Sequence, residues 1–202
     1  MTQLIEALSY PFVQRAIAAG VMISLCAALL GVILVLKQYS LIGHGLGDVG
    51  FASTSLAVAL GLPVMAVSIP IVVVAACLIM FWSQRSKTGG DTAIGMVATG
   101  ALSIGVIITA MSSGFNVDVN GYMFGSILAM SRDDVVFSVV LSIVILVLFI
   151  LFYNRLFLIT FDENFAKASG INVGFYQFLI ALLTALTVVM GMRMMGSLLI
   201  SS

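Results

Sequence analysis

The sequence predicts an all-helical, polytopic membrane protein, a bundle of transmembrane helices forming one permease-like domain over residues 1–202. Its residues are 62% hydrophobic and 8% charged, whereas a soluble domain carries about 25% charged residues. Apolar runs of about 20 residues, the length that crosses a bilayer as a helix, recur along the chain. Eight basic and eight acidic residues leave no net charge, so we expect a lipid environment and no nucleic-acid partner.

Three of the six complete spans that we expect lie in the first part of the chain. The first covers about residues 13–36. The second, residues 45–62, is rich in Gly, Ala, Ser and Thr, which predicts close packing inside the bundle. The third covers residues 63–82, with Pro70 inside it and Trp82 at its end, where an aromatic ring fits the membrane interface.

The fourth span is expected over residues 93–112. Asp91 stands just before it, so its carboxylate is expected to cap the start of the helix. Gly95, Gly100 and Gly105 follow at regular intervals. Residues without side chains let helices approach closely, so these glycines predict a close-packing face.

The second half of the chain alternates polar segments with two further spans. Residues 113–134 are too polar to span, and a re-entrant or interfacial helix is expected there. The fifth span, 135–153, is aliphatic on all sides and is expected to face lipid. An amphipathic helix is expected over about 162–170. The sixth span covers 175–191, and the residues after it resemble the start of a seventh.

The distribution of basic residues predicts the orientation of the chain. Five of the eight basic residues fall on one side of the expected spans, and the positive-inside rule places that side in the cytoplasm and the N-terminus outside the cell. The cytoplasmic group is Lys37, Arg85, Lys87, Arg155 and Lys167, and the outer group is Arg15, Arg132 and Arg193.

The candidate functional residues are His44, the only histidine of the chain, and Asp48. Residues at i and i+4 share one face of a helix, so the imidazole and the carboxylate can bind one cation or each other. A carboxylate inside a span costs roughly 2.5–3.5 kcal/mol at the helix centre and is functional by default. Three roles stay open: a ligand on a transport path, a structural pair, or a proton relay. The nearby hydroxyls of residues 53–55 can orient the carboxylate.

Two other groups of side chains have competing interpretations. Thioethers suit Cu(I), but methionine is a common packing residue and the cluster does not share one face, so packing is expected for Met190, Met192, Met194 and Met195. Acidic residues on the outer side can attract cations or contact a partner, or they are solvated helix caps beside Arg132. These are Asp118, Asp133 and Asp134.

Four stretches together resemble the metal-ion permease family of ABC importers. They are GVILVLKQYSLIGHGLGDVGFAS, DTAIGMVATGALSIGVI, MFGSILAMSRDD, and FDENFAKASGINV with the sixth span up to GMRMMGSLLIS. The resemblance implies a multi-pass subunit of the cell membrane that imports zinc first, or manganese next, by ATP-driven alternating access. It also implies a homodimer with a cytoplasmic ATP-binding subunit and an extracytoplasmic metal-binding protein. The resemblance further predicts that the chain is C-terminally truncated relative to this family.

The resemblance also assigns roles to residues. The family carries an aspartate at position 44 and a histidine at position 48, and this sequence exchanges them. The resemblance makes His44 and Asp48 metal ligands of the transport path. It makes the segment around 162–170 a coupling helix for the ATP-binding subunit, whereas the residues alone also fit an ordinary surface helix. The coupling residues are Phe161, Asp162, Glu163, Phe165, Ala166 and Gly170.

The expected activity is transport without bond chemistry in this chain. The sequence contains no G-x-x-x-x-G-K-[ST] phosphate-binding motif, so ATP hydrolysis is expected on a separate subunit, and no permanently bound cofactor is expected. The alternative is an ATP-independent or proton-coupled secondary transporter in which Asp48 is the titrating group.

Overall fold

The computed structural model describes residues 10–85, 90–111 and 132–196. These residues form helices and contain no strand, which confirms the all-helical fold class. Residues 113–131 of the expected re-entrant segment and the residues after 196 lie outside the described part, whereas residues 132–134 form the start of a long helix. The helices are α2 (Pro11–Leu36), α3 (Ile42–Ala59), α4 (Val64–Arg85), α5 (Gly90–Met111), α7 (Arg132–Phe161), α8 (Glu163–Ala168) and α9 (Val173–Met195).

Five of the described helices are long and apolar enough to cross a membrane. They correspond to the expected first, third, fourth, fifth and sixth spans. The expected second span corresponds to α3, which has 18 residues and includes His44 and Asp48, and it is not among the five. The protein is therefore a multi-pass membrane protein in which α3 is the most polar of the long helices. The candidate spans are Val13–Leu36, Val64–Trp82, Gly90–Met111, Val135–Phe161 and Val173–Met192.

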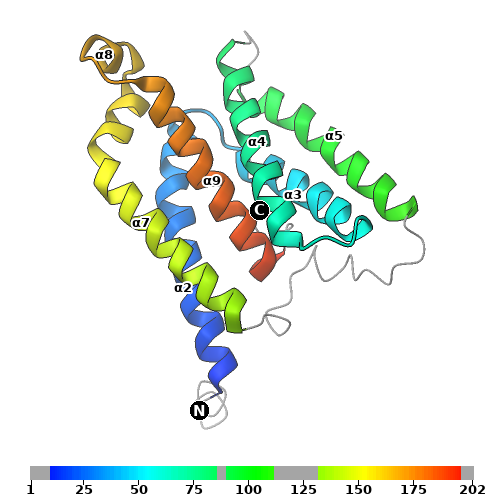
Figure 1. Cartoon of the computed structure of the whole chain (residues 1–202). Coiled ribbons are helices and arrows are strands. Elements are labelled where there is room, and N and C mark those ends of the chain that lie inside the picture. Colours follow the sequence, from blue (N-terminus) through cyan, green and yellow to red (C-terminus); the bar gives the residue numbers. More distant parts are fainter. Residues whose placement is uncertain (1–9, 86–89, 112–131, 197–202) are drawn as a thin grey trace.

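The helices form two groups with α9 between them (Figure 1). On one side α2 packs against α7, and on the other side α3 packs against both α4 and α5. The helix α9 contacts members of both groups. Of the membrane-spanning windows, that of α9 is 72% buried, whereas the other four are 17–33% buried. The prediction that α3 is enclosed is also confirmed, since most of its residues are buried.

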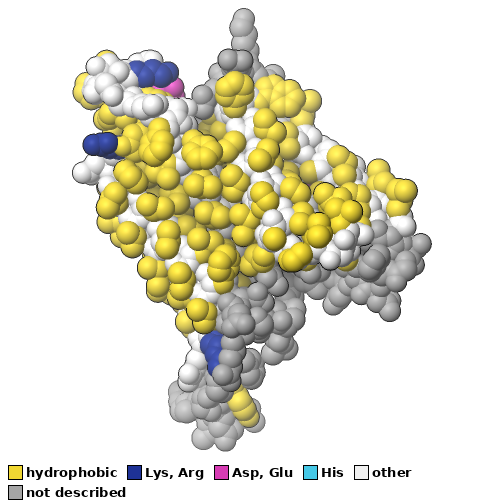
Figure 2. Space-filling view, in the orientation of Figure 1, with side chains coloured by type: hydrophobic (Ala, Val, Ile, Leu, Met, Phe, Trp, Pro, Cys, Tyr) yellow, Lys and Arg dark blue, Asp and Glu magenta, His cyan; other side chains and the backbone are white. Residues whose placement is uncertain are grey.

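The surface has the pattern expected of a protein in lipid. On the face shown in Figure 2, hydrophobic side chains cover the middle of the bundle, and the Lys, Arg and acidic side chains in view lie near α8 and near the N-terminal end. The aliphatic side chains of α7 that point outward include Val140, Val147 and Ile150. In a bilayer such side chains contact lipid instead of water, so their exposure fits the lipid-facing position predicted for the fifth span.

Two sequence expectations about α5 are wrong. The helix begins at Gly90, so Asp91 lies inside its first turn, and the Asp91 carboxylate accepts a hydrogen bond from Leu41 N of the preceding segment instead. Gly105 packs closely against α3, but a Cβ on Gly95 or Gly100 would meet no atom within 4 Å. Residues five apart in a helix point in different directions, so regular spacing alone did not define one face.

Candidate functional site

The start of α3 is fixed by contacts on both sides. After α2 ends, Gln38 adopts φ 61° and Tyr39 N donates to the Leu34 carbonyl at 2.9 Å, which reverses the chain. Leu41, the residue before α3, then donates its N–H to Asp91 Oδ1 of α5 at 3.1 Å. As a result, the first turn of α3, which contains His44, lies beside the first turn of α5.

Glycines allow α3 and α5 to lie in close contact. A Cβ on Gly45 would lie 2.6 Å from Ile94 Cγ2, and a Cβ on Gly105 would lie 2.9 Å from Phe51 Cδ1 and 3.0 Å from Ala52 Cα. Carbon atoms normally approach to about 3.5–4.0 Å, so neither position has room for a side chain. Asp48 lies between these two contacts in the sequence of α3, and His44 lies directly before the first.

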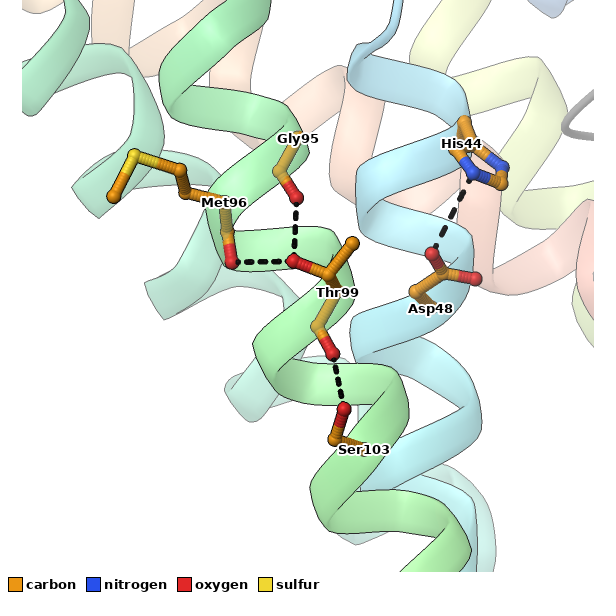
Figure 3. A network of polar contacts seen from close by, with 6 residues as sticks. All are labelled: His44, Asp48, Gly95, Met96, Thr99 and Ser103. Atoms are coloured by element: carbon orange, nitrogen blue, oxygen red, sulfur yellow. Dashed lines mark hydrogen bonds and ion pairs between the residues drawn. The ribbon is translucent and has the colours of Figure 1, made fainter.

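His44 and Asp48 lie one above the other on one face of α3 (Figure 3). The distance from His44 Nε2 to Asp48 Oδ2 is 3.6 Å, and the side chains are 48% and 16% exposed. A hydrogen bond between nitrogen and oxygen is about 2.7–3.2 Å long. The pair is therefore close enough to attract electrostatically, but it is not locked by a direct hydrogen bond, and both groups remain accessible.

The neighbouring hydroxyl groups bond elsewhere. On α5, Thr99 donates to the Gly95 carbonyl at 3.0 Å and the Ser103 hydroxyl donates to the Thr99 carbonyl at 2.8 Å (Figure 3). On α3, Ser53 donates to the Gly50 carbonyl, and Ser55 accepts from Thr109 of α5 at 3.1 Å. The Thr54 hydroxyl lies 3.5 Å from the Ser68 hydroxyl of α4. None of these contacts of residues 53–55 reaches the Asp48 carboxylate; they join α3 to its own backbone, to α4 and to α5.

The donor set available to a metal ion within one chain is small. In the part of the chain that the structure describes, no group of three His, Cys, Asp or Glu side chains is placed to hold a metal ion. Two ligands of one tetrahedral zinc ion, each at about 2.1 Å, lie about 3.4 Å apart. The distance between Nε2 and Oδ2 is 3.6 Å, which is close to that separation.

The second candidate region is the segment around α8. Phe161 is the last residue of α7 and is exposed. Asp162 caps α8 by accepting a hydrogen bond from Phe165 N at 2.9 Å, and Phe165 is also exposed. Ala166 is fully buried and anchors α8 to the bundle. The end of α7 and the start of α8 therefore present two exposed phenylalanine rings at one end of the bundle.

The helix α8 is joined to its neighbours through Glu163. Its Oε1 accepts from Lys167 Nζ at 2.7 Å, and its Oε2 accepts from Gln177 Nε2 of α9 at 3.2 Å. Lys37 directly follows α2. Burial lowers the pKa of its ammonium group, and the negative charge of Glu163 offsets only part of this decrease. Gly170 then ends the segment at φ 77°, a conformation that favours glycine.

Gln177 and Tyr176 belong to this region, although the sequence did not single them out. Gln177 is only 7% exposed, and Tyr176 OH accepts a hydrogen bond from Arg155 Nη1 at 2.6 Å. The available signal was a glutamine inside the apolar run VGFYQFLIALL, because a buried amide needs a hydrogen-bond partner.

The structure describes three of the four clustered methionine side chains but none of the three acidic side chains singled out in the sequence. Met190, Met192 and Met194 are buried among apolar side chains, which supports packing over metal binding. The Met195 side chain, residue 118 and the side chains of residues 132–134 lie outside the described part of the chain.

Taken together, the fold and the site define a multi-pass helical membrane protein with an ionisable pair in its most polar long helix, the arrangement of a transport protein. The chain belongs to the ABC 3 transport family, whose model matches residues 9–202.

The chain is similar in sequence to membrane proteins of manganese and zinc transport systems. The chain is 29% identical over 195 residues to the manganese transport system membrane protein MntC of Halalkalibacterium halodurans, covering 96% of this chain and 67% of that protein. It is 31% identical over 193 residues to the high-affinity zinc uptake system membrane protein ZnuB of Haemophilus influenzae, covering 93% and 72%. The solved structure of PsaBC from Streptococcus pneumoniae in complex with Fab superposes with a TM-score of 0.83 at 28% identity, covering 99% of this chain and 72% of that one.

Proposed function

We propose that this chain is the membrane permease of an ABC importer that moves divalent metal ions into the cell by ATP-driven alternating access. The observation that supports the proposal most directly is the His44–Asp48 pair, whose Nε2 and Oδ2 atoms lie 3.6 Å apart and are accessible on α3. A carboxylate in a membrane helix is energetically costly, and such residues usually serve a function. A loose site with few ligands suits transport, because an ion that is bound too tightly is not released.

The proposed cargo is zinc first and manganese next. Imidazole and carboxylate are both ordinary zinc ligands, and the spacing of the pair fits tetrahedral coordination. Carboxylate oxygens also suit manganese, and the relatives include proteins named for either metal. Measuring uptake of each metal in the presence of the other shows which of the two the transporter prefers.

The proposed oligomer is a homodimer. One chain offers two donors at this site, whereas zinc prefers four ligands. A second copy related by two-fold symmetry would present the same pair from the opposite side. His44 is 48% exposed in the isolated chain, so its ring is available for a site shared between two copies.

The proposed orientation places α8 in the cytoplasm and the N-terminus outside. Arg155 and Lys167 lie at the end of the bundle that carries α8, where they bond to Tyr176 and Glu163. Lys37 is close enough to Glu163 for their charges to interact. Basic residues concentrate on the cytoplasmic side. The exposed rings of Phe161 and Phe165 are then available to a separate ATP-binding subunit, with Asp162, Glu163, Ala166 and Gly170 holding the helix in place. A metal-binding protein would deliver the ion at the opposite side.

A proton-coupled carrier is the second candidate. It is favoured by the partial burial of Asp48 beside a histidine, since a carboxylate and an imidazole can exchange a proton. The purified chain in liposomes separates the two candidates. The importer requires the ATP-binding subunit for uptake, whereas a carrier transports the metal ion without that subunit when a pH gradient is applied.

The proposed site is tested by metal uptake in cells that carry His44→Ala, Asp48→Ala or both changes. We expect each change to reduce uptake and the double change to abolish it, while the chain remains in the membrane with its partners. Thr99→Val is the matched control, because Thr99 lies beside the pair in Figure 3 but bonds to its own helix. Normal uptake by an assembled double variant would exclude this site.

A further inference from the structure

The helix α9 is the best-enclosed element of the bundle. Its spanning window is 72% buried, and it contacts α2, α3, α4, α7 and α8. It contains no proline, and the hydroxyls of Thr184 and Thr187 donate to carbonyls of the preceding turn at 2.8 Å. Sharp kinks in helices are mostly caused by proline, so a displacement at one end of α9 is expected to move the other.

The first end of α9 is attached to α8. Gln177 lies in the second turn of α9 and is 7% exposed, and its Nε2 donates to Glu163 Oε2 at 3.2 Å. The other carboxylate oxygen of Glu163 accepts from Lys167 within α8. Glu163 therefore uses one oxygen to stabilise its own short helix and the other to hold α9. A buried amide without a partner is costly, which keeps this contact formed.

The far end of α9 touches α3 close in sequence to the candidate metal site, on a different face of α3 from His44 and Asp48. Met192 is 7% exposed, and a Cβ on Gly50 would overlap the Sδ and Cε atoms of Met192. Gly50 lies two residues beyond Asp48 on α3. From Gln177 to Met192, α9 extends about 22 Å at about 1.5 Å per residue. One helix thus joins the segment that faces the proposed ATP-binding subunit to the helix that carries His44 and Asp48.

There is also room for α9 to move relative to α2 and α3. A cavity of about 370 Å³ lies between α2, the start of α3 and α9, and Thr184 and Thr187 are among its lining residues. Closely packed helices move by small sliding displacements, which need unfilled space beside the helix. The cavity supplies that space next to the middle of α9.

We propose that α9 transmits displacements of α8 to α3, entering through the Glu163–Gln177 hydrogen bond and leaving through the Met192–Gly50 contact. This inference rests on the proposed importer function. It makes Gln177 and Met192 positioning residues: neither is assigned contact with the metal ion, and both act by setting the position of α3. The exposed rings of Phe161, at the end of α7, and Phe165, on α8, then receive the movement of the ATP-binding subunit, and α9 delivers it to α3, which carries the His44–Asp48 pair.

The test measures two quantities on one sample of the assembled transporter in liposomes: zinc ions taken up and ATP hydrolysed. Gln177→Met removes the amide but keeps a side chain of similar size, and we expect it to lower the zinc uptake per ATP by about fivefold, a typical size for a change in coupling. Lys167→Met is the matched control, because it removes the exposed partner of the same carboxylate, and we expect an unchanged ratio.

A second variant tests the far end of α9. Met192 lies 15 residues from Gln177, so Met192→Ala leaves the hydrogen bond between α8 and α9 intact. This variant therefore stays informative even when Gln177→Met assembles poorly. We expect Met192→Ala to lower the same ratio, and the double variant to be no worse than the more affected single variant, since both interrupt one route. Wild-type ratios in assembled variants, or independent losses that multiply in the double variant, would overturn the inference. Absence of ATP-dependent zinc uptake by the wild-type transporter would instead contradict the proposed function.

Discussion

Replacing Gly105 by alanine tests the close contact between α3 and α5 on which the position of the candidate site depends. The new Cβ would lie 2.9 Å from Phe51 Cδ1 and 3.0 Å from Ala52 Cα. The Phe51 ring can rotate, but the Cα of Ala52 is backbone, so α3 and α5 must separate by about 0.5–1 Å to restore normal contacts. Overpacking of this kind costs about 1–3 kcal/mol.

Gly100→Ala is the matched control for this prediction. It lies on the same helix, but a Cβ there would meet no atom within 4 Å, so only the higher helix propensity of alanine acts, about 1 kcal/mol in favour of the variant. Both variants receive that gain, and the difference between them isolates the overlap at Gly105. We expect Gly105→Ala to unfold about 2–12 °C below Gly100→Ala in detergent. Equal unfolding temperatures, or a more stable Gly105→Ala, would refute the close packing of α3 on α5.

Three further predictions concern the connections around the site. Gln38→Gly relieves the left-handed conformation at φ 61° and should raise the free energy of unfolding by about 0.5–1 kcal/mol, measured in denaturant. Asp162→Ala removes the hydrogen bond from Phe165 N, costs about 1 kcal/mol and should weaken binding of the ATP-binding subunit in a titration, whereas Asp162→Asn should retain most of it. Burial lowers the pKa of Lys37 below 10.5, so the unfolded state binds more protons as pH approaches that value. Stability should therefore rise with pH in this range relative to Lys37→Met, and equal pH profiles in thermal unfolding would contradict it.

The long helices could be predicted from the sequence because lipid imposes a simple rule on them. About 20 apolar residues make a span, and α2, α4, α5, α7 and α9 each contain such a run. The end of α7 was less predictable. It continues to Phe161 because the aliphatic pattern extends past Tyr153 through mixed residues, and the Asp162 cap, not the first polar residue, ends the helix.

The candidate pair could also be predicted, because i and i+4 residues on one helix need only local geometry. The contacts between helices could not. Asp91 caps the start of α3 instead of its own helix, and Gln177 holds Glu163 across the gap between α8 and α9. Each of these bonds joins residues that are distant in the sequence or on different elements, and their partners depend on how the helices pack and rotate. Sequence spacing on one helix does not determine that packing.

The proposal of an ATP-driven metal importer is tested most directly by the uptake of radioactive zinc or manganese. The liposomes contain this chain, its ATP-binding subunit and the metal-binding protein. We predict uptake by the wild-type chain only when ATP and the ATP-binding subunit are both present. We predict that Asp48→Asn, which keeps the size of the side chain but removes its charge, reduces uptake at least tenfold with the complex intact. Uptake that continues without the ATP-binding subunit, or that is unchanged in Asp48→Asn, would contradict the assignment of α3 as the metal-binding helix of an ATP-driven importer.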